Sequence, residues 1–212
     1  MDKREQLIFL WKKQGLKFSS KVIKAFKNTP REKFLLEGYD ARAYEDNPLP
    51  ILAGQTISQP STVLKMLDVL DVKYGDKILE VGTGSGYNAA LLSKLTWKKG
   101  FVYTTEIIDS LAEFSRNNLN KLKIKNVEVI KTDGSQGLAE KAPFDRIIVT
   151  AACAKMPDIL IDQLKVNGIL VAPVGPMYVQ NLIKLKKTPK RIKEESLGQY
   201  QFVPLTGRHG FA

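Results

Sequence analysis

Three glycines on alternate positions form the stretch of this sequence with the clearest chemical meaning. Gly82, Gly84 and Gly86 follow a short run of apolar and β-branched residues, 77–81, and precede an alanine- and leucine-rich segment, 87–95. This pattern predicts a buried strand, a glycine turn and a helix, the first half of a nucleotide-binding βαβ unit. Glycine suits such a turn because a Cβ would keep the backbone away from a ligand or from positive φ.

The spacing of these glycines indicates the kind of nucleotide. A dinucleotide fingerprint has its third glycine three residues after the second, whereas here the third glycine comes at position 86. With an acid two residues before Gly82, the stretch resembles the first motif of the class I S-adenosylmethionine-dependent methyltransferases. The resemblance implies that S-adenosyl-L-methionine is the cofactor and is bound by Glu80, Gly82, Thr83, Gly84, Ser85, Gly86 and Asn88. Taken alone, the loop also fits an ordinary tight turn.

Two acids at the ends of later strands extend the nucleotide signal. Glu106 follows a predicted strand at 101–105, about 20 residues past the glycine loop, where a carboxylate accepts both ribose hydroxyls. A solvated loop acid is the alternative. Asp133 follows a predicted strand at 127–131, where an acid can accept a hydrogen bond from an adenine amino group, although Asp-Gly is also a common turn. We expect Glu106, Ile107, Asp133 and Gly134 to belong to the cofactor site.

A serine near the middle of the first half of the chain is the candidate for substrate chemistry. Ser58 lies in the stretch 54–60, directly before a predicted apolar helix that continues to residue 70. A serine in this place commonly caps the helix that follows it. A role for Ser58 in catalysis therefore depends on the family resemblance described below.

Composition limits the class of protein and its organisation. The chain has 212 residues, 43% hydrophobic and 26% charged, which predicts one soluble globular domain. We expect a single methyltransferase domain over 1–212, with N-terminal helices and a substrate-side loop in 1–58 and the cofactor-binding core and edge strands in 59–212. The apolar run 7–11 is too short for a membrane span or signal peptide. One cysteine, Cys153, excludes an internal disulfide, so we expect a reducing, cytoplasmic location.

The formal net charge of +11 would steer an anionic partner to the surface. The charges are dispersed, however, and the densest run, 184–193, alternates with Leu185 and Ile192 as an exposed hairpin would. A solvated lysine-rich surface is the favoured interpretation, and a nucleic-acid patch is the alternative.

The order of predicted elements indicates a Rossmann-like, doubly wound and mostly parallel sheet of the α/β class. Besides the segments above, we predict helices at 3–14, 20–28, 111–122 and 157–164, strands at 146–150 and 168–174, and antiparallel edge additions at 177–187 and 200–205. Residues 38–55 form a long irregular loop. The N-terminal helices and this loop are expected to cover the C-terminal ends of the strands, where ligands of such sheets bind.

From about residue 43 to residue 211 the chain resembles the protein-L-isoaspartate (D-aspartate) O-methyltransferase family. The matching stretches are 56–60, 79–87, 133–134, 142–152, 163–165, 171–175 and 202–205. The resemblance implies that Ser58 is the active-site serine beside the cofactor methyl, and that Gln55, Thr56 and Ile57 line the same pocket. Residues 202–205 would border the substrate groove. The chain departs from the family at Ser61, where many relatives have histidine, and at Thr132, where glycine is usual.

The resemblance further implies the reaction. A methyl group would pass from S-adenosyl-L-methionine to the free carboxylate of L-isoaspartyl residues in damaged proteins, with D-aspartyl residues as a further candidate, and repair would proceed through a succinimide. Because a carboxylate is already ionised near neutral pH, no general base is required. We therefore expect His209 to be a surface residue, Cys153 to be a packed small residue, and no metal to be bound.

Two other hypotheses compete with this one. The positive charge allows a methyltransferase acting on RNA or another substrate, although the sequence has no Asn/Asp-Pro-Pro-aromatic motif of amide or base methylation; residues 46–49 come nearest. The second competing hypothesis is a non-catalytic module that binds an adenosyl ligand. The expected partners are isoaspartyl-containing proteins and peptides, with no stable nucleic-acid partner, no membrane and a monomeric state.

Overall fold

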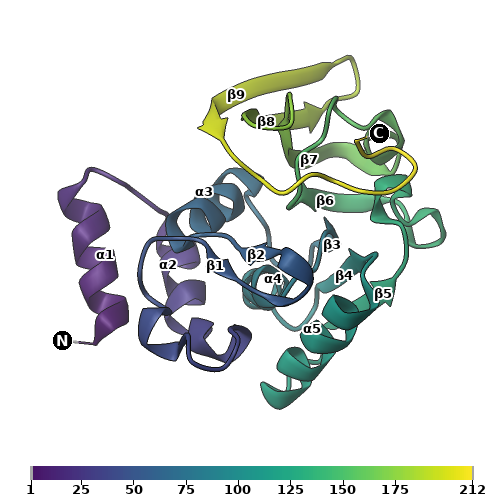
Figure 1. Cartoon of the computed structure of the whole chain (residues 1–212). Helices are drawn as coiled ribbons and strands as arrows, with labels where there is room; N and C mark the ends of the chain where they lie inside the picture. The colour runs from purple at the N-terminus through teal and green to yellow at the C-terminus, as the bar shows by residue number, and fades with distance from the viewer. Residues whose placement is uncertain (1, 212) are drawn as a thin grey trace.

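The computed structural model describes residues 2–211, which contain a seven-stranded sheet covered by helices on both faces (Figure 1). The strand order is β5-β4-β3-β6-β7-β8-β9. Strands β3 to β7 are parallel, and β8 and β9 are antiparallel additions. The bounds are β3 Lys77–Val81, β4 Phe101–Glu106, β5 Val127–Lys131, β6 Phe144–Val149, β7 Leu164–Val174, β8 Gln180–Lys187 and β9 Ile192–Tyr200. The predicted fold class is confirmed.

The chain order creates a crevice at the middle of the sheet. From β3 the chain passes outward through β4 to β5 and then crosses back to β6 on the other side of β3. The connection that follows β3 runs to one side of this strand, toward β4, and the connection that follows β5 runs to its other side, to β6. The strand order therefore reverses at β3. Ligands of open parallel sheets bind at this kind of switch point, beyond the carboxyl ends of the strands.

The central strands are apolar on both faces because both faces are covered. Ile78 and Leu79 are both fully buried but belong to different apolar clusters, as the alternation of side chains along a strand requires. Helices α3 (Pro60–Leu70), α4 (Tyr87–Thr96) and α5 (Asp109–Lys121) contribute to the cluster that contains Ile78. Helix α6 (Asp158–Asp162) contributes to the cluster that contains Leu79.

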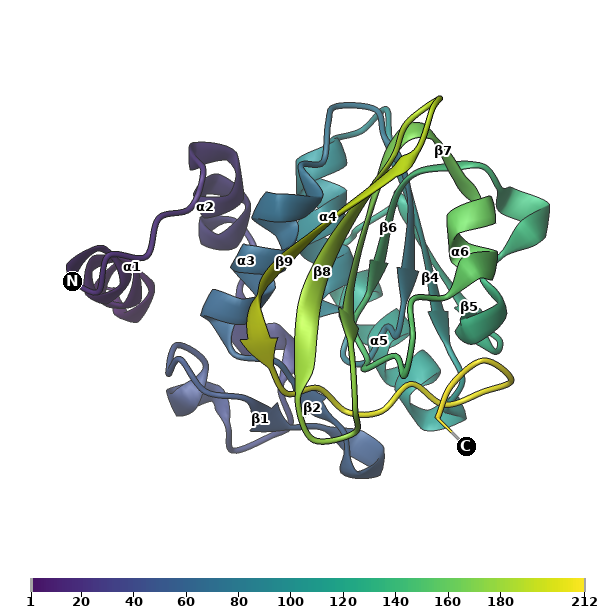
Figure 2. The same ribbon diagram turned by 90° about the horizontal axis from the view of Figure 1, so that it is seen from above.

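The N-terminal helices occupy a different place from the one predicted. Helices α1 (Lys3–Lys13) and α2 (Ser20–Lys27) form as expected, but α2 packs on α3 and α4, and the pair forms an outer layer at the side of the sheet (Figure 2). The apolar side of α2, with Val22 and Phe26 fully buried, matches the outer surface of these helices. The expectation that the N-terminal helices cover the strand ends is wrong.

The long loop after α2 contains short ordered elements and does reach the strand ends. It comprises the 3-10 turns η1 (Arg31–Phe34), η2 (Asp40–Arg42) and η3 (Leu52–Gly54), and the short strands β1 (Leu49–Pro50) and β2 (Thr56–Ile57). The strands β1 and β2 pair antiparallel. The backbone N–H of Ile51 donates to the carbonyl of Gln55 at 2.8 Å, which closes the turn between them.

The C-terminal strand also differs from the prediction. The last strand of the sheet is Ile192–Tyr200 rather than 200–205, and residues 201–211 continue outside it. Most of β9 is exposed, so its sequence carries no alternating apolar signal. Residues 202–205 instead cross the strand ends, where the N–H of Ala152 donates to Val203 at 2.7 Å and the N–H of Leu205 donates to Ala152 at 2.8 Å. The predicted hairpin at 184–193 is confirmed.

Smaller differences concern where elements begin and end. The helix expected at 157–164 is confined to five residues, and β7 starts at Leu164 rather than at residue 168. Among residues 2–211, no helix is long and apolar enough to cross a membrane.

Candidate active site

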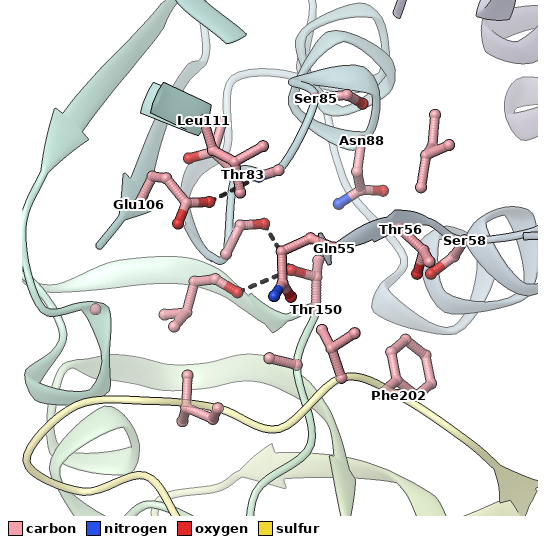
Figure 3. A pocket seen from close by; sticks show the side chains of 18 of the residues that line it. Gln55, Thr56, Ser58, Thr83, Ser85, Asn88, Glu106, Leu111, Thr150 and Phe202 are labelled. Carbon is pink, nitrogen blue, oxygen red and sulfur yellow. Dashed lines mark hydrogen bonds between the residues drawn. The ribbon is translucent and has the colours of Figure 1, made fainter. Parts of the chain in front are cut away.

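A pocket of about 1100 Å³, including open solvent at its mouth, lies at the carboxyl ends of the central strands (Figure 3). It brings together twelve of the residues expected at the site: Gln55, Thr56, Ile57, Ser58, Gly82, Thr83, Gly84, Ser85, Asn88, Glu106, Ile107 and Gly134. These residues come from β2, the glycine loop, α4, the end of β4 and the turn after β5. Glu80, Gly86 and Asp133 are not on its wall.

The glycine loop passes close to the end of β6, and one glycine is required for that approach. Gly82 has φ +96°, and a Cβ there would lie 2.4 Å from Thr150 Oγ1. The Thr150 hydroxyl donates to the carbonyl of Gly82 at 2.6 Å, while the N–H of Gly82 donates to the carbonyl of Thr105 at 3.0 Å. The loop is thus fixed to the ends of β4 and β6, the two strands on either side of β3, with its backbone facing the pocket.

Gly86 serves helix packing rather than the pocket wall. It is the residue before α4 and has φ +85°. A Cβ at Gly86 would lie 3.3 Å from the Cβ of Ser115 on α5. The third glycine therefore lets α4 begin close against α5.

Glu106 presents a buried carboxylate at the end of β4. Its oxygens accept hydrogen bonds from the backbone N–H groups of Gly84 at 2.9 Å, Ile107 at 3.0 Å and Ile108 at 3.1 Å. A carboxylate has about four acceptor positions, so at least one stays available for a donor in the pocket. These contacts fix the acid relative to the glycine loop.

Glu80 lies behind the pocket wall rather than on it. Its carboxyl group is fully buried and accepts from Asn88 Nδ2 at 2.7 Å and from the Thr104 hydroxyl at 2.6 Å. Burial raises the pKa of Glu80 to about 7, although both hydrogen bonds act in the opposite direction. Glu80 therefore reaches a ligand only indirectly, through Asn88 or through Thr104 and its hydrogen-bonded neighbour Thr83, and both Asn88 and Thr83 line the pocket.

Asp133 is held by the C-terminal segment and not by the pocket. Its carboxylate accepts from the backbone N–H of Ser135 at 2.9 Å and of Arg208 at 2.8 Å. These bonds lower its pKa against the opposing effect of desolvation. The expected hydrogen bond from Asp133 to an adenine amino group stays a prediction. The neighbouring Gly134 does line the pocket, at a position where a Cβ would lie 2.2 Å from Thr105 Oγ1.

Ser58 faces the pocket and does not cap a helix. The residue that caps α3 is Gln59, followed by Pro60 at the first helical position. Figure 3 shows the Thr56 and Ser58 side chains together on one side of the pocket and Glu106 on the other. Within residues 2–211 the Ser58 hydroxyl has no hydrogen-bond partner, which leaves it available to a ligand.

The two positions that depart from the family pattern, Ser61 and Thr132, lie outside the pocket wall. Ser61 is not on the pocket wall; its backbone N–H donates to Asp46 at 2.9 Å. Thr132 is likewise not on that wall.

Several wall residues were not predicted as site residues. Leu111, Thr150 and Ala151 belong to this group. Thr150 follows β6 directly, so the rule that sites form at strand ends would have identified it. Phe202, which the family resemblance placed at the border of the substrate groove, lines the pocket as well.

His209 and Cys153 take the places expected of them. His209 is exposed and Cys153 is buried. Desolvation raises the pKa of the Cys153 thiol to about 12, which keeps it protonated and unreactive.

Comparisons with known proteins agree with this geometry. The chain matches the family described as protein-L-isoaspartate(D-aspartate) O-methyltransferase (PCMT) over residues 2–210. A Pyrococcus horikoshii protein named protein-L-isoaspartate O-methyltransferase is 44% identical over 212 residues, covering 99% of this chain and 96% of the relative.

Two solved structures extend the comparison. A protein-L-isoaspartate O-methyltransferase superposes with a TM-score of 0.88 at 31% identity, covering 98% of this chain and 67% of that chain. A Plasmodium falciparum protein assigned to the same enzymes was solved in complex with S-adenosyl-L-homocysteine. It superposes with a TM-score of 0.83 at 29% identity, covering 96% of this chain and 98% of that chain. The chain therefore belongs to the protein-L-isoaspartate(D-aspartate) O-methyltransferase family, as its sequence motifs predict.

Proposed function

We propose that this chain transfers a methyl group from S-adenosyl-L-methionine to the free carboxylate of L-isoaspartyl residues in damaged proteins. One observation carries the proposal: a single pocket has a free serine hydroxyl on one side and a glycine loop with a buried carboxylate on the other. The first side suits an anionic substrate group, and the second suits a nucleoside. D-Aspartyl residues are a further candidate substrate.

The lining of the pocket fits the chemistry of the cofactor. The positive φ of Gly82 and the close approach at Gly134 keep side chains out of the space that such a ligand needs. When bound, S-adenosyl-L-methionine supplies a methyl group on a positively charged sulfur. We assign its ribose to Glu106 and the remaining contacts to Gln55, Thr56, Ile57, Gly82, Thr83, Gly84, Ser85, Asn88, Ile107 and Gly134.

Ser58 orients the substrate carboxylate without protonating it. A hydroxyl can donate to a carboxylate oxygen while leaving its negative charge in place. Holding reacting atoms roughly 3 Å apart in a fixed direction supplies a large part of an enzyme's advantage. Ile57 and Phe202 are both buried, and both contribute apolar wall that limits water beside Ser58.

The product explains why methylation begins repair. The methoxy group of a methyl ester leaves far more readily than the oxygen of a carboxylate, so the main-chain amide nitrogen can attack the ester carbonyl and expel methanol. The resulting succinimide can open to normal aspartate. The protein's own part ends with release of the ester.

We also propose a monomeric protein in the reducing environment of the cytoplasm, without a stable nucleic-acid partner. The single cysteine supports the compartment, and the dispersed distribution of lysines supports the absence of a dedicated nucleic-acid surface. Sedimentation at several protein concentrations tests the monomeric state. Filter binding of RNA at low and high salt tests the absence of a stable nucleic-acid partner.

The decisive experiment uses methyl-labelled S-adenosyl-L-methionine and two peptides that differ only in one aspartyl or isoaspartyl linkage. We expect base-labile label on the isoaspartyl peptide alone. Equal label on both peptides would contradict the substrate assignment. Label on neither peptide, with the cofactor bound, would direct attention to RNA and then to a non-catalytic binding role.

A further inference from the structure

The turn between β7 and β8, residues 175–179, exposes three consecutive apolar side chains. Tyr178 is 79% exposed, Met177 44% and Val179 42%. Single exposed apolar residues are normal on a protein surface. Three in succession at the tip of one turn form a patch, here called the apolar turn, which is unfavourable in water unless something covers it.

The apolar turn lies at the same end of the sheet as the pocket. Strand β7 is parallel to β6, so its carboxyl end at Val174 points the same way as the strand ends that form the pocket. Figure 2 shows the connection from β7 to β8 at the end where β1, β2 and the C-terminal segment lie. The turn therefore borders the region that a substrate must cross.

A buried glutamine fixes the apolar turn to the rim of the pocket. Gln180 is 1% exposed, and its Nε2 donates to the carbonyls of Pro176 at 2.6 Å and Met177 at 3.0 Å. Its Oε1 accepts from the backbone N–H of Phe202 at 2.9 Å, and Phe202 lines the pocket. One side chain thus holds both the exposed turn and the rim in place before any partner binds.

A second connection runs through the backbone. The N–H of Gly175 donates to the carbonyl of Cys153 at 2.9 Å, and Ala152 next to it bonds Val203 and Leu205 on the rim. The apolar turn is therefore tied at both of its ends, and its exposed side chains are presented by a fixed scaffold. Such pre-organisation reduces the entropy lost on binding.

We propose that the apolar turn is a docking surface for the polypeptide that flanks the isoaspartyl residue, and that it favours substrates with an apolar or aromatic side chain near the damaged site. The inference rests on the proposed function, because the reacting carboxylate belongs to a longer chain that must leave the pocket across its rim. Residues 202–205 form that rim, and the apolar turn is connected to the rim through the hydrogen bonds of Gln180. Tyr178 is the specificity-determining residue.

The test compares two isoaspartyl peptides, one with leucine and phenylalanine flanking the site on both sides and one with serine and glycine there. For the wild-type protein we expect a KM several-fold lower for the apolar peptide. The double variant Met177→Ser/Tyr178→Ser should raise the KM of that peptide several-fold, to about the KM of the polar peptide. The kcat, the KM of the polar peptide and the cofactor affinity should stay unchanged.

Tyr74→Ser is the matched control, because Tyr74 is 61% exposed and lies just before the amino end of β3, at the opposite end of the sheet. It should change neither peptide's kinetics. Equal KM values for the two peptides with the wild-type protein, or equal losses with the double variant, would overturn the docking role. Concentration-dependent self-association that the double variant abolishes would do so as well, by assigning the turn to a second copy of the chain.

Failure of the docking role is distinct from failure of the proposed function. If the wild-type protein methylates both peptides but does not distinguish them, only the docking role is lost. If it methylates neither isoaspartyl peptide, the proposed function is lost as well.

Discussion

At the scale of single residues, the pocket divides its work between a serine hydroxyl and a glutamate side chain. Ser58 has no partner among residues 2–211, whereas Glu106 is already held by three backbone N–H groups. The first is free to orient a substrate, and the second is a rigid acceptor for ligand hydroxyls. Substitution should therefore affect different kinetic quantities at the two positions.

Replacing Ser58 by alanine should lower kcat by about 10- to 100-fold, since a hydrogen bond to a charged group is worth about 1.5–3 kcal/mol. The Kd of S-adenosyl-L-homocysteine should change little. Steady-state kinetics with an isoaspartyl peptide and calorimetric titration of the nucleoside measure the two quantities. Unchanged kcat would remove the role assigned to Ser58. Ser61→Ala is the control, because Ser61 is the next serine in the chain but lies off the pocket wall.

Replacing Glu106 by alanine should weaken S-adenosyl-L-homocysteine binding by at least about tenfold, because a charged acceptor for hydroxyl groups is lost. At saturating cofactor, kcat should fall much less than in the serine variant. Calorimetric titration measures the affinity. Circular dichroism checks that the variant is still folded, because Glu106 also anchors the glycine loop. Wild-type affinity in the variant would contradict the ribose assignment.

Glu80 predicts a pH-dependent stability. Its pKa of about 7 in the folded protein exceeds the ordinary value of 4.5, so the folded state binds more protons between these pH values. Its favourable contribution is complete below about pH 4.5 and is lost as the pH rises through 7.

Glu80→Gln removes this titration and should gain stability relative to wild type with rising pH, by roughly 2–3 kcal/mol at and above pH 7. Denaturant unfolding of both ligand-free proteins from pH 5 to pH 8 measures the difference. A difference that does not vary with pH would show that this carboxyl does not titrate in the interval.

At the scale of elements, short turns at the strand ends build the site. The β1–β2 turn carries Ser58 to the pocket, and the glycine loop is bonded to the ends of β4 and β6. Both turns use positive φ, with Ala53 at +55° and Gly82 at +96°. The precision of the site thus comes from backbone geometry held by adjacent strands.

Gly82→Ala tests this dependence on backbone geometry. The new Cβ would meet the Thr150 hydroxyl, so the loop must shift, and we expect a loss of stability of at least about 1–3 kcal/mol with weaker cofactor binding. Gly198→Ala is a matched control, with φ +104° and no atom within 4 Å of the new Cβ. Equal effects of the two substitutions would assign the cost to φ alone, without the steric contact. Thermal melting and nucleoside titration measure both.

At the scale of the whole molecule, one apolar cluster joins the N-terminal helices to the sheet. It contains Trp11 and Phe26 from the outer layer, Leu64 from α3 and Ile78 from β3. We therefore propose that the chain unfolds as one domain, with a single calorimetric transition. Two separate transitions would contradict this.

Ligand binding should shift that transition as a whole. At 100 times its Kd, S-adenosyl-L-homocysteine should add about 2.7 kcal/mol and raise Tm by roughly 5–10 °C, since the pocket joins segments from residues 55 to 206. Scanning calorimetry with and without the nucleoside measures the shift, and adenine at equal concentration is the control. An unchanged Tm would contradict nucleoside binding at this pocket.

The sequence by itself determined the features that depend on local spacing. The strand–glycine–helix unit around Gly82, the acid at the end of β4 and the parallel α/β class follow from residues close together in the chain, because turn conformation and side-chain alternation are local properties. The motif around Ser58 indicated the family for the same reason. Twelve of the expected site residues consequently meet in one pocket.

Only the tertiary structure decided which distant surfaces meet. Asp133 bonds the backbone of Arg208, which its local Asp-Gly context does not predict. Phe202, expected at the substrate groove from the family resemblance alone, reaches the pocket from the far end of the chain. The outer place of α1 and α2 and the exposed strand β9 were missed for a related reason. An amphipathic helix does not specify which apolar surface it covers, and a strand exposed on both faces has no apolar pattern, so long-range packing decides both.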